Sequence, residues 1–125
     1  MSEERDPLTG FILSTSIRIH TELGPGMLET VYEQVLAAAL ARHGVAFARQ
    51  VPIDIDYDGL KIAGAFKADL IVDDRIVIEL KCIERLAPVH SRQLLTYLRL
   101  TGYKFGLLVN FGGKTLMEGF QRMIL

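Results

Sequence analysis

The chain has 125 residues and a mass of 14.0 kDa; half of the residues are hydrophobic, and the mean hydropathy is +0.26. This length and apolar content support a single domain, residues 1–125, that folds without disulfides or a structural metal. The formal net charge of −1 argues against a uniformly basic nucleic-acid-binding protein, and a lone cysteine, Cys82, cannot form an internal disulfide.

Two helices are predicted before any strand. Asp6-Pro7 supplies an N-cap and a first-turn proline, and apolar residues then recur at helical spacing until Gly24-Pro25-Gly26 ends the helix. A second apolar stripe predicts a helix from about Met27 to His43, closed by Gly44. Residues 1–6 are expected to be a disordered N-terminal segment.

The middle of the chain is typical of strands. Residues 45–57 alternate with period two, and a turn at Asp58-Gly59 predicts another short strand after it. Residues 67–72, "KADLIV", and residues 75–81, "RIVIELK", are predicted as two further strands flanking Asp73-Asp74.

The last third predicts a helix and then a strand. Ala87-Pro88 begins a helix that reaches Gly102, and residues 104–111 form a continuous apolar strand. The tail, residues 115–125, favours a strand over a short helix. Since the central strands are apolar on both faces, we expect helices on both sides of a mixed sheet, which is an α/β sandwich.

Glu79 and Lys81 interrupt the apolar run that begins at Ile76. If Asp73-Asp74-Arg75 is a three-residue hairpin loop, Val72 pairs with Ile76 and Asp69 lies opposite Glu79. A two-residue loop would instead turn Glu79 to the other face of the sheet, because a one-residue slip inverts every side chain. The register therefore decides whether the two carboxylates can act together.

Lys81 projects from the same face as Glu79, so two carboxylates and one amine would meet at a strand end. Two such carboxylates repel unless a proton or a cation lies between them, and oxygen ligands favour a hard ion such as Mg²⁺. Lysine beside the ion can stabilise a hydroxide nucleophile or the developing charge on a phosphate. The alternative is an ordinary strand-end ion pair of Lys81 with Asp69 or Glu79.

Other polar residues fall at helical spacing near this site. Gln93 and Tyr97 lie four apart on one helix face, where each can hold a phosphate oxygen or a bound water. Glu29 and Glu33, also four apart, could each supply a third carboxylate, and the partly apolar setting of Glu29 favours it. The alternatives are a packing role for Tyr97, solvation for Gln93, and a helix-dipole role for the two glutamates.

The ordered set of motifs resembles the PD-(D/E)xK nuclease superfamily, and within it the GxxExxY family of small bacterial proteins. The resemblance rests on "IHTELGPGMLETVYEQVL", which contains Gly26-x-x-Glu29-x-x-Tyr32, and on "RQVPIDIDYDG", "FKADLIVDDRIVIELK", "HSRQLLTYLRLTGYKFGLLVNFG" and "GFQRM". It extends from Ile19 to Met123. The superfamily's proline is absent, since Ala68 precedes Asp69.

This resemblance implies a restriction-endonuclease-like αβββαβ core and a metal-dependent nuclease. Asp69, Glu79 and the backbone carbonyl of Leu80 would bind Mg²⁺ or Mn²⁺, and Lys81 would assist the attacking water. Gln93 and Tyr97 resemble the Gln-xxx-Tyr motif of exonuclease-type members, and Glu29 stands where those members carry an acidic residue on a helix. The alternative is a catalytically inactive nuclease-fold protein that acts as a nucleic-acid-binding or protein-assembly module.

The charge distribution bears on the partner. Residues 1–74 hold 6 Lys/Arg against 12 Asp/Glu, whereas residues 75–125 hold 8 against 3. We expect the basic half to contact nucleic-acid phosphates, with DNA favoured, through Arg85, Arg92, Arg99 and Lys104. Without a secretory signal or an apolar run of about 18 residues, the expected location is the cytoplasm and no membrane partner is expected. A homodimer would supply two sites for duplex cleavage, but the sequence indicates no interface.

Overall fold

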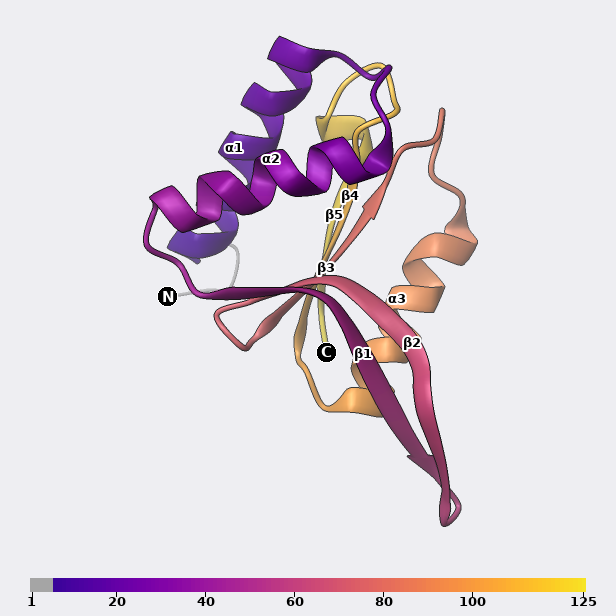
Figure 1. Ribbon diagram of the computed structural model, residues 1–125. Helices are drawn as coiled ribbons and strands as arrows, with labels where there is room; N and C mark the ends of the chain where they lie inside the picture. Colours follow the sequence, from indigo (N-terminus) through magenta and orange to yellow (C-terminus); the bar gives the residue numbers. More distant parts are fainter. Residues whose placement is uncertain (1–5) are drawn as a thin grey trace.

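A mixed five-stranded sheet, in the order β1-β2-β3-β4-β5, forms the middle of the protein (Figure 1). Only β3 and β4 run parallel, and the other neighbouring strands are antiparallel. The computed structural model describes residues 6–125. Its elements are α1 (Pro7–Leu23), α2 (Glu29–Arg42), β1 (Phe47–Tyr57), β2 (Leu60–Val72), β3 (Ile76–Lys81), α3 (Pro88–Thr101), β4 (Phe105–Asn110), the short 3-10 helix η2 (Met117–Gly119) and β5 (Phe120–Ile124).

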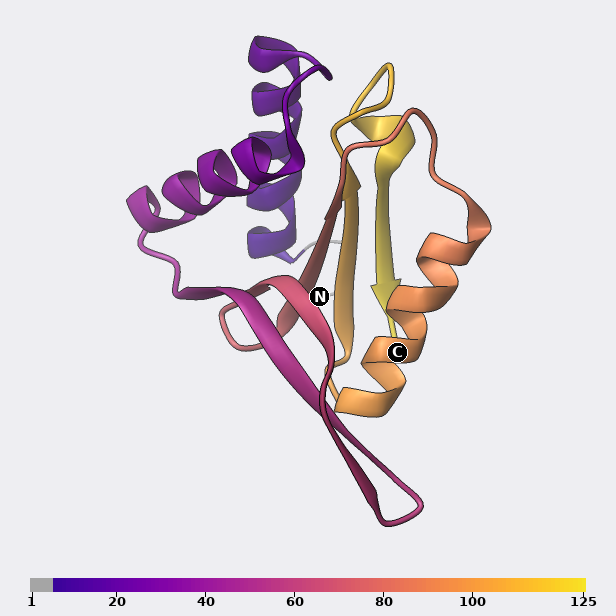
Figure 2. The same cartoon turned by 45° about the vertical axis from the view of Figure 1, so that its right-hand side comes forward.

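Helices cover both faces of the sheet, as the apolar central strands predicted (Figure 2). On one face, Tyr32 and Leu36 of α2 pack with Ile12 of α1 and the inward residues of β3 and β4. On the other face, Leu94 and Leu98 of α3 pack on the opposite side of the same strands. The α/β class and the restriction-endonuclease-like arrangement are therefore confirmed.

The strand prediction was wrong at one point, because β2 is a single strand of 13 residues and not two short ones. It pairs with β1 from Phe66 to Val72 and again from Leu60 to Ile62, and the register shifts between Ile53 and Ile55. Residues 63–65 have no partner in this ladder, and the Gly64 N–H donates instead to the Asp54 side chain at 2.8 Å. Pairing with β1 on both sides of this bulge keeps β2 a single strand. The tail contains both elements that were weighed for it, η2 followed by β5.

Asp6 caps α1 and ties it to the sheet. Its carboxylate accepts a hydrogen bond from the Leu8 backbone N–H at 2.9 Å and pairs with Arg75 in the β2–β3 turn at 2.6 Å. Asp6 therefore does not belong to a disordered segment, while residues 1–5 of that prediction lie outside the described residues. No helix within residues 6–125 combines the length and apolar character needed to cross a membrane.

Candidate active site

The predicted register of the β2–β3 hairpin is confirmed. Val72 pairs with Ile76, so the connecting loop has three residues, Asp73 to Arg75. Asp73 and Asp74 adopt positive φ angles of 54° and 49°, which aspartate tolerates better than most residues and which turns the chain back on itself.

This register places two carboxylates on the α3 side of the sheet. Ile71 and Val77 belong to the core beneath α3, and side chains two residues further along each strand, Asp69 and Glu79, point to the same face. Asp69 Oδ2 accepts a hydrogen bond from the Leu80 backbone N–H at 2.8 Å. Because the N–H and C=O of a strand residue point to the same edge, the Leu80 carbonyl faces β2 as well.

Glu79 is the most perturbed of these groups. Its side chain is buried, and its Oε1 has no hydrogen-bond partner among residues 6–125. Burial, together with the negative charge of Asp69, raises its pKa to about 8. Burial also raises the pKa of Asp69 and of Glu29. A divalent cation between these oxygens would offset the repulsion of their charges and would be coordinated by the Glu79 oxygen that lacks a hydrogen-bond partner among residues 6–125. The residues present therefore fit such an ion.

Lys81 lies within electrostatic reach of all three carboxylates, and its charge lowers the pKa of Glu79, Asp69 and Glu29. It takes part in no ion pair with another residue of the described part of the chain. The strand-end ion pair that was the alternative explanation is thus not formed. The ammonium is left available beside the carboxylates.

Helix α3 brings Tyr97 to the same place. Burial and the charge of Glu79 raise the pKa of the Tyr97 phenol, and a hydrogen bond with Gln93 lowers it. The Tyr97 ring stacks on Phe66 of β2 with centroids 3.7 Å apart. The helix therefore contributes a phenol and an amide next to Glu79, at the four-residue spacing seen in the sequence.

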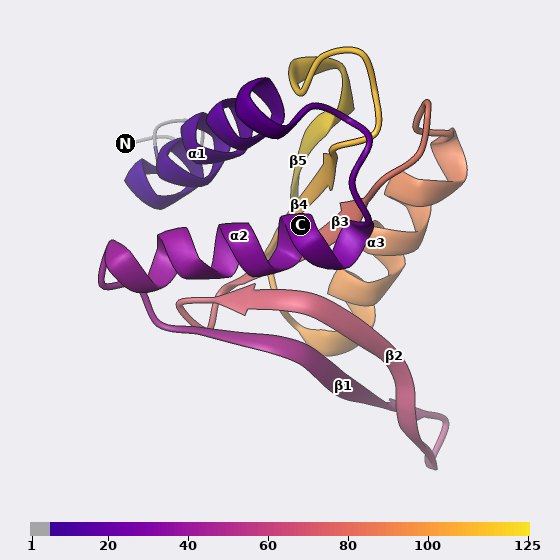
Figure 3. The same cartoon turned by 45° about the horizontal axis from the view of Figure 1, so that its top comes forward.

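Glu29 is the first residue of α2, and this end of the helix lies beside the end of β3 (Figures 1 and 3). The loop before it is held from two sides. The Tyr32 hydroxyl donates to the Gly24 carbonyl and accepts from the Met27 N–H at 3.1 Å, and the Cys82 thiol donates to the Met27 carbonyl at 3.1 Å. The Tyr32 hydroxyl thus closes the loop that leads to Glu29, three residues before it on α2.

Replacing Tyr32 with phenylalanine keeps the buried ring but removes both of these hydrogen bonds. We expect a loss of about 1–3 kcal/mol in the free energy of unfolding, since the Met27 N–H and the Gly24 carbonyl lose their partner. Urea titration measures this loss, and Tyr57→Phe is the matched control because Tyr57 is 70% exposed. Equal stability of the two variants would contradict a closing role for the Tyr32 hydroxyl.

Glu33, the other glutamate weighed as a third carboxylate, is engaged elsewhere. It is buried, its Oε2 pairs with Arg49 at 2.9 Å, and its Oε1 accepts from the Gln50 side chain. The same Gln50 amide donates to Asp69 Oδ1 at 3.3 Å. Sequence reasoning missed Gln50, because it stands in an alternating strand and no spacing links it to Asp69.

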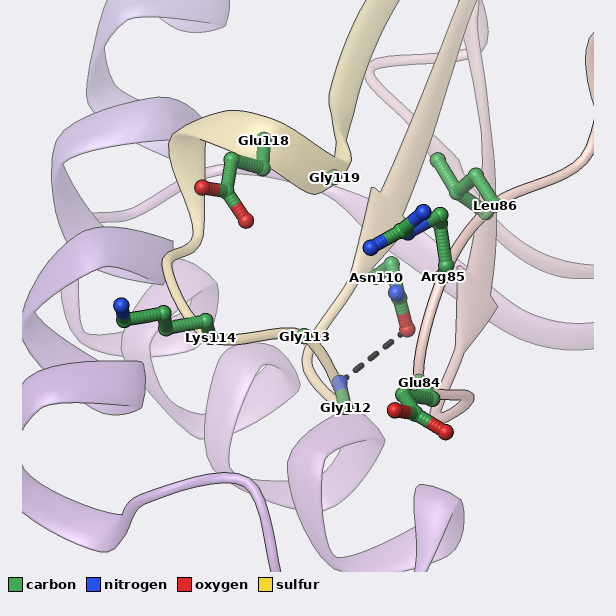
Figure 4. A pocket seen from close by; sticks show the side chains of 9 residues that line it. All are labelled: Glu84, Arg85, Leu86, Asn110, Gly112, Gly113, Lys114, Glu118 and Gly119. Carbon is green, nitrogen blue, oxygen red and sulfur yellow. Dashed lines mark hydrogen bonds between the residues drawn. The ribbon is translucent and has the colours of Figure 1, made fainter.

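Asn110 at the end of β4 was also missed. Its side-chain oxygen accepts from the N–H of Ile83 at 3.0 Å, and its side-chain nitrogen donates to the carbonyl of Ile83 at 2.8 Å. The same oxygen accepts from the N–H of Gly112 at 3.0 Å (Figure 4). Asn110 therefore fixes the segment that follows Lys81. A buried asparagine ending an apolar strand is the signal that could have found it.

A cavity of about 330 Å³ opens between the segments that follow β3 and β4 (Figure 4). Two basic and two acidic side chains are among those that line it, Arg85, Lys114, Glu84 and Glu118. None of the six expected catalytic residues lines this cavity, namely Glu29, Asp69, Glu79, Lys81, Gln93 and Tyr97. The cavity is thus separate from the carboxylate site, although Arg85 was expected to contact nucleic acid.

The basic residues expected to bind nucleic acid are all exposed but do not gather at one point. Arg85 precedes α3, Arg92 and Arg99 lie on it, and Lys104 follows it. A helix of 14 residues is about 21 Å long, so these four cations are spread along the length of α3. They could follow an extended backbone better than they could surround one phosphate.

Comparison with known families gives one result. A model of the PD-(D/E)XK nuclease superfamily matches residues 6–123, which is nearly the whole chain. Comparisons with curated proteins and with solved structures gave no match. The narrower assignment to the GxxExxY family stays a prediction. The strand-end carboxylates, the lysine two residues beyond Glu79 and the extent of the match agree, and the chain belongs to the PD-(D/E)XK nuclease superfamily.

Proposed function

We propose that this protein is a metal-dependent nuclease that hydrolyses phosphodiester bonds of nucleic acid. The observation that carries the proposal is the buried Glu79 oxygen without a hydrogen-bond partner among the described residues, beside Asp69 and an unpaired Lys81 at one strand end. A nuclease superfamily supports the reaction class. A binding module would gain nothing from burying neighbouring carboxylates, because burial disfavours their charged forms.

The ligands in this proposal are Asp69, Glu79 and the Leu80 carbonyl, which would hold Mg²⁺ or Mn²⁺. Within residues 6–125, no three His, Cys, Asp or Glu side chains converge closely enough to hold an ion by themselves. Mg²⁺ commonly keeps several waters and takes one or two carboxylates plus a substrate phosphate, so a two-carboxylate site suits it. The ion would supply Lewis-acid polarisation of the phosphodiester.

The remaining residues act on the substrate and its water. The Lys81 ammonium would lower the pKa of the attacking water and stabilise the charge that develops on the phosphate. Tyr97, held by Gln93, would donate a hydrogen bond to a phosphate oxygen, and Glu29 would accept one from a water on the α2 side. The electrostatic influence of Lys81 and Glu29 on Glu79, and of Glu79 on Tyr97, supports these roles.

Substrate binding would rest on Arg85, Arg92, Arg99 and Lys104, which would contact the backbone of DNA through salt-sensitive phosphate contacts. Their spread along α3 supports an extended strand as the substrate. Membership of the GxxExxY family, a cytoplasmic location and homodimerisation belong to the same proposal.

Asp69→Asn is expected to lower the cleavage rate at least about a hundredfold, because the substitution removes a charged ligand of the cation. The assay offers single-stranded, duplex and branched DNA, and RNA, to the purified protein with Mg²⁺, Mn²⁺ or a chelator. Asp56→Asn is the matched control, since Asp56 is an exposed strand aspartate of the β1–β2 hairpin. Equal rates for Asp69→Asn and wild type would contradict the mechanism, and binding without cleavage would favour the inactive module.

A further inference from the structure

Gln50 has a backbone conformation that its strand does not predict. Its φ angle is 51°, although it lies inside β1 and is not glycine. The β1–β2 ladder pairs Arg49 with Leu70 and Val51 with Ala68, and it skips Gln50. A left-handed conformation is unfavourable for a residue other than glycine and persists only where surrounding contacts hold it.

The side chain of Gln50 supplies those contacts. Its amide nitrogen donates one hydrogen bond to Glu33 Oε1 and one to Asp69 Oδ1, the second at 3.3 Å. Glu33 is in turn paired with Arg49 at 2.9 Å. The neutral amide of Gln50 thus bridges the carboxylates of Glu33 and Asp69. This bridge links α2 to β2, the strand that bears Asp69.

The Asp69 carboxylate is fixed by two donors on different oxygens. Oδ1 accepts from Gln50, and Oδ2 accepts from the Leu80 N–H at 2.8 Å. Each carboxylate oxygen has two acceptor sites, so one site on each oxygen remains open for a cation. Without Gln50 the carboxylate could rotate about its Cβ–Cγ bond, and the bond to Leu80 would no longer be held in one orientation.

We propose that Gln50 is a positioning residue that holds the Asp69 carboxylate against the Leu80 N–H and so prepares it for a cation. Only the consequence for cation binding rests on the proposed nuclease function. The hydrogen bonds of Gln50 and Asp69 are features of the structure and do not depend on that function. The strained backbone of Gln50 follows from this role, because a regular strand conformation would direct its side chain away from the bridge between Glu33 and Asp69.

Gln50→Gly separates positioning from folding, because glycine adopts positive φ without strain and should keep the melting temperature close to that of wild type. We expect the Leu80 amide of the metal-free variant to exchange about tenfold faster, measured by NMR. The affinity for Mn²⁺, measured by calorimetry, should fall about tenfold, in line with the effect of losing a partner that orients a ligand. Gln50→Met, which keeps a side chain of similar length without donors or charge, should lose the same affinity, and Gln121→Ala, at an exposed strand position, should lose none.

Unchanged Leu80 exchange in Gln50→Gly would overturn the inference, whatever the protein cleaves. Unchanged Mn²⁺ affinity in a variant of a cation-binding wild type would overturn it as well and leave the nuclease proposal intact. A wild type that neither binds Mn²⁺ nor cleaves nucleic acid would remove the proposed function, and the Leu80 exchange rate would still decide whether Gln50 holds Asp69.

Discussion

Lys81→Met is expected to lower kcat for phosphodiester cleavage by about a hundredfold to a thousandfold, the usual cost of losing one preorganised charge at a reacting phosphate. Methionine keeps an unbranched apolar stem of similar length but carries no charge. The affinity for Mn²⁺ should change far less, because Lys81 is not among the expected ligands. Single-turnover cleavage together with calorimetry measures both quantities.

The pH profile supplies a second readout for the same variant. The charge of Lys81 lowers the pKa of Glu79, so its removal raises that pKa further, and the acid limb of the cleavage profile should move to higher pH. Lys61→Met is the matched control, since Lys61 is an exposed lysine near the tip of the β1–β2 hairpin. A thousandfold loss of Mn²⁺ affinity with unchanged kcat would show that Lys81 organises the ion site and not the reaction.

The position of the carboxylate pair could be predicted because it depends on local information. A three-residue loop with two aspartates at positive φ sets the register, and alternation along each strand then places Asp69 and Glu79 on one face. The four-residue spacing of Gln93 and Tyr97 is equally local. The relative positions of these residues within the hairpin and within α3 could therefore be predicted from the sequence.

The connections between elements could not be predicted in the same way. Gln50, Glu33 and Asp69 come from three different elements, and their contact depends on how α2 lies across β1. The positive φ of Gln50 could not be predicted from the alternation of apolar and polar residues in the strand. Contacts with other elements impose this backbone conformation on a residue type that does not favour it. The continuity of β2 was missed for a related reason, since pairing with β1 on both sides of the bulge at residues 63–65 joins two segments that the sequence pattern separates.

The site is costly for the metal-free protein. Glu79 has a buried oxygen without a partner in the described part of the chain, and burial raises the pKa of three neighbouring carboxylates. The charge of Lys81 acts in the opposite direction and lowers the pKa of each. Removing the most buried charge should therefore stabilise the fold while it removes the capacity to hold a cation, a trade-off that is common at functional sites.

Glu79→Gln is expected to stabilise the metal-free protein by an amount that grows with pH. The pKa of Glu79 is about 8 in the folded protein against an ordinary value of 4.5, so between these values the native state binds more protons than the unfolded state. The wild type therefore loses stability as pH rises from about 4.5 through 8, and the variant lacks this loss. The difference in free energy of unfolding should reach about 3–5 kcal/mol near pH 9 and be small near pH 5.

The same substitution should abolish stabilisation by cations. A ligand that binds only the native state raises its stability by linkage, and deprotonation of Glu79 makes wild-type binding tighter as pH rises. Mg²⁺ or Mn²⁺ should thus raise the melting temperature of wild type more at pH 8.5 than at pH 6, and that of Glu79→Gln at neither pH. Glu84→Gln is the matched control, at an exposed position after β3. If the difference in free energy of unfolding between Glu79→Gln and wild type does not change from pH 5 to pH 9, Glu79 is not the group with the raised pKa. The proposal that its carboxylate binds a cation when deprotonated would then fail as well.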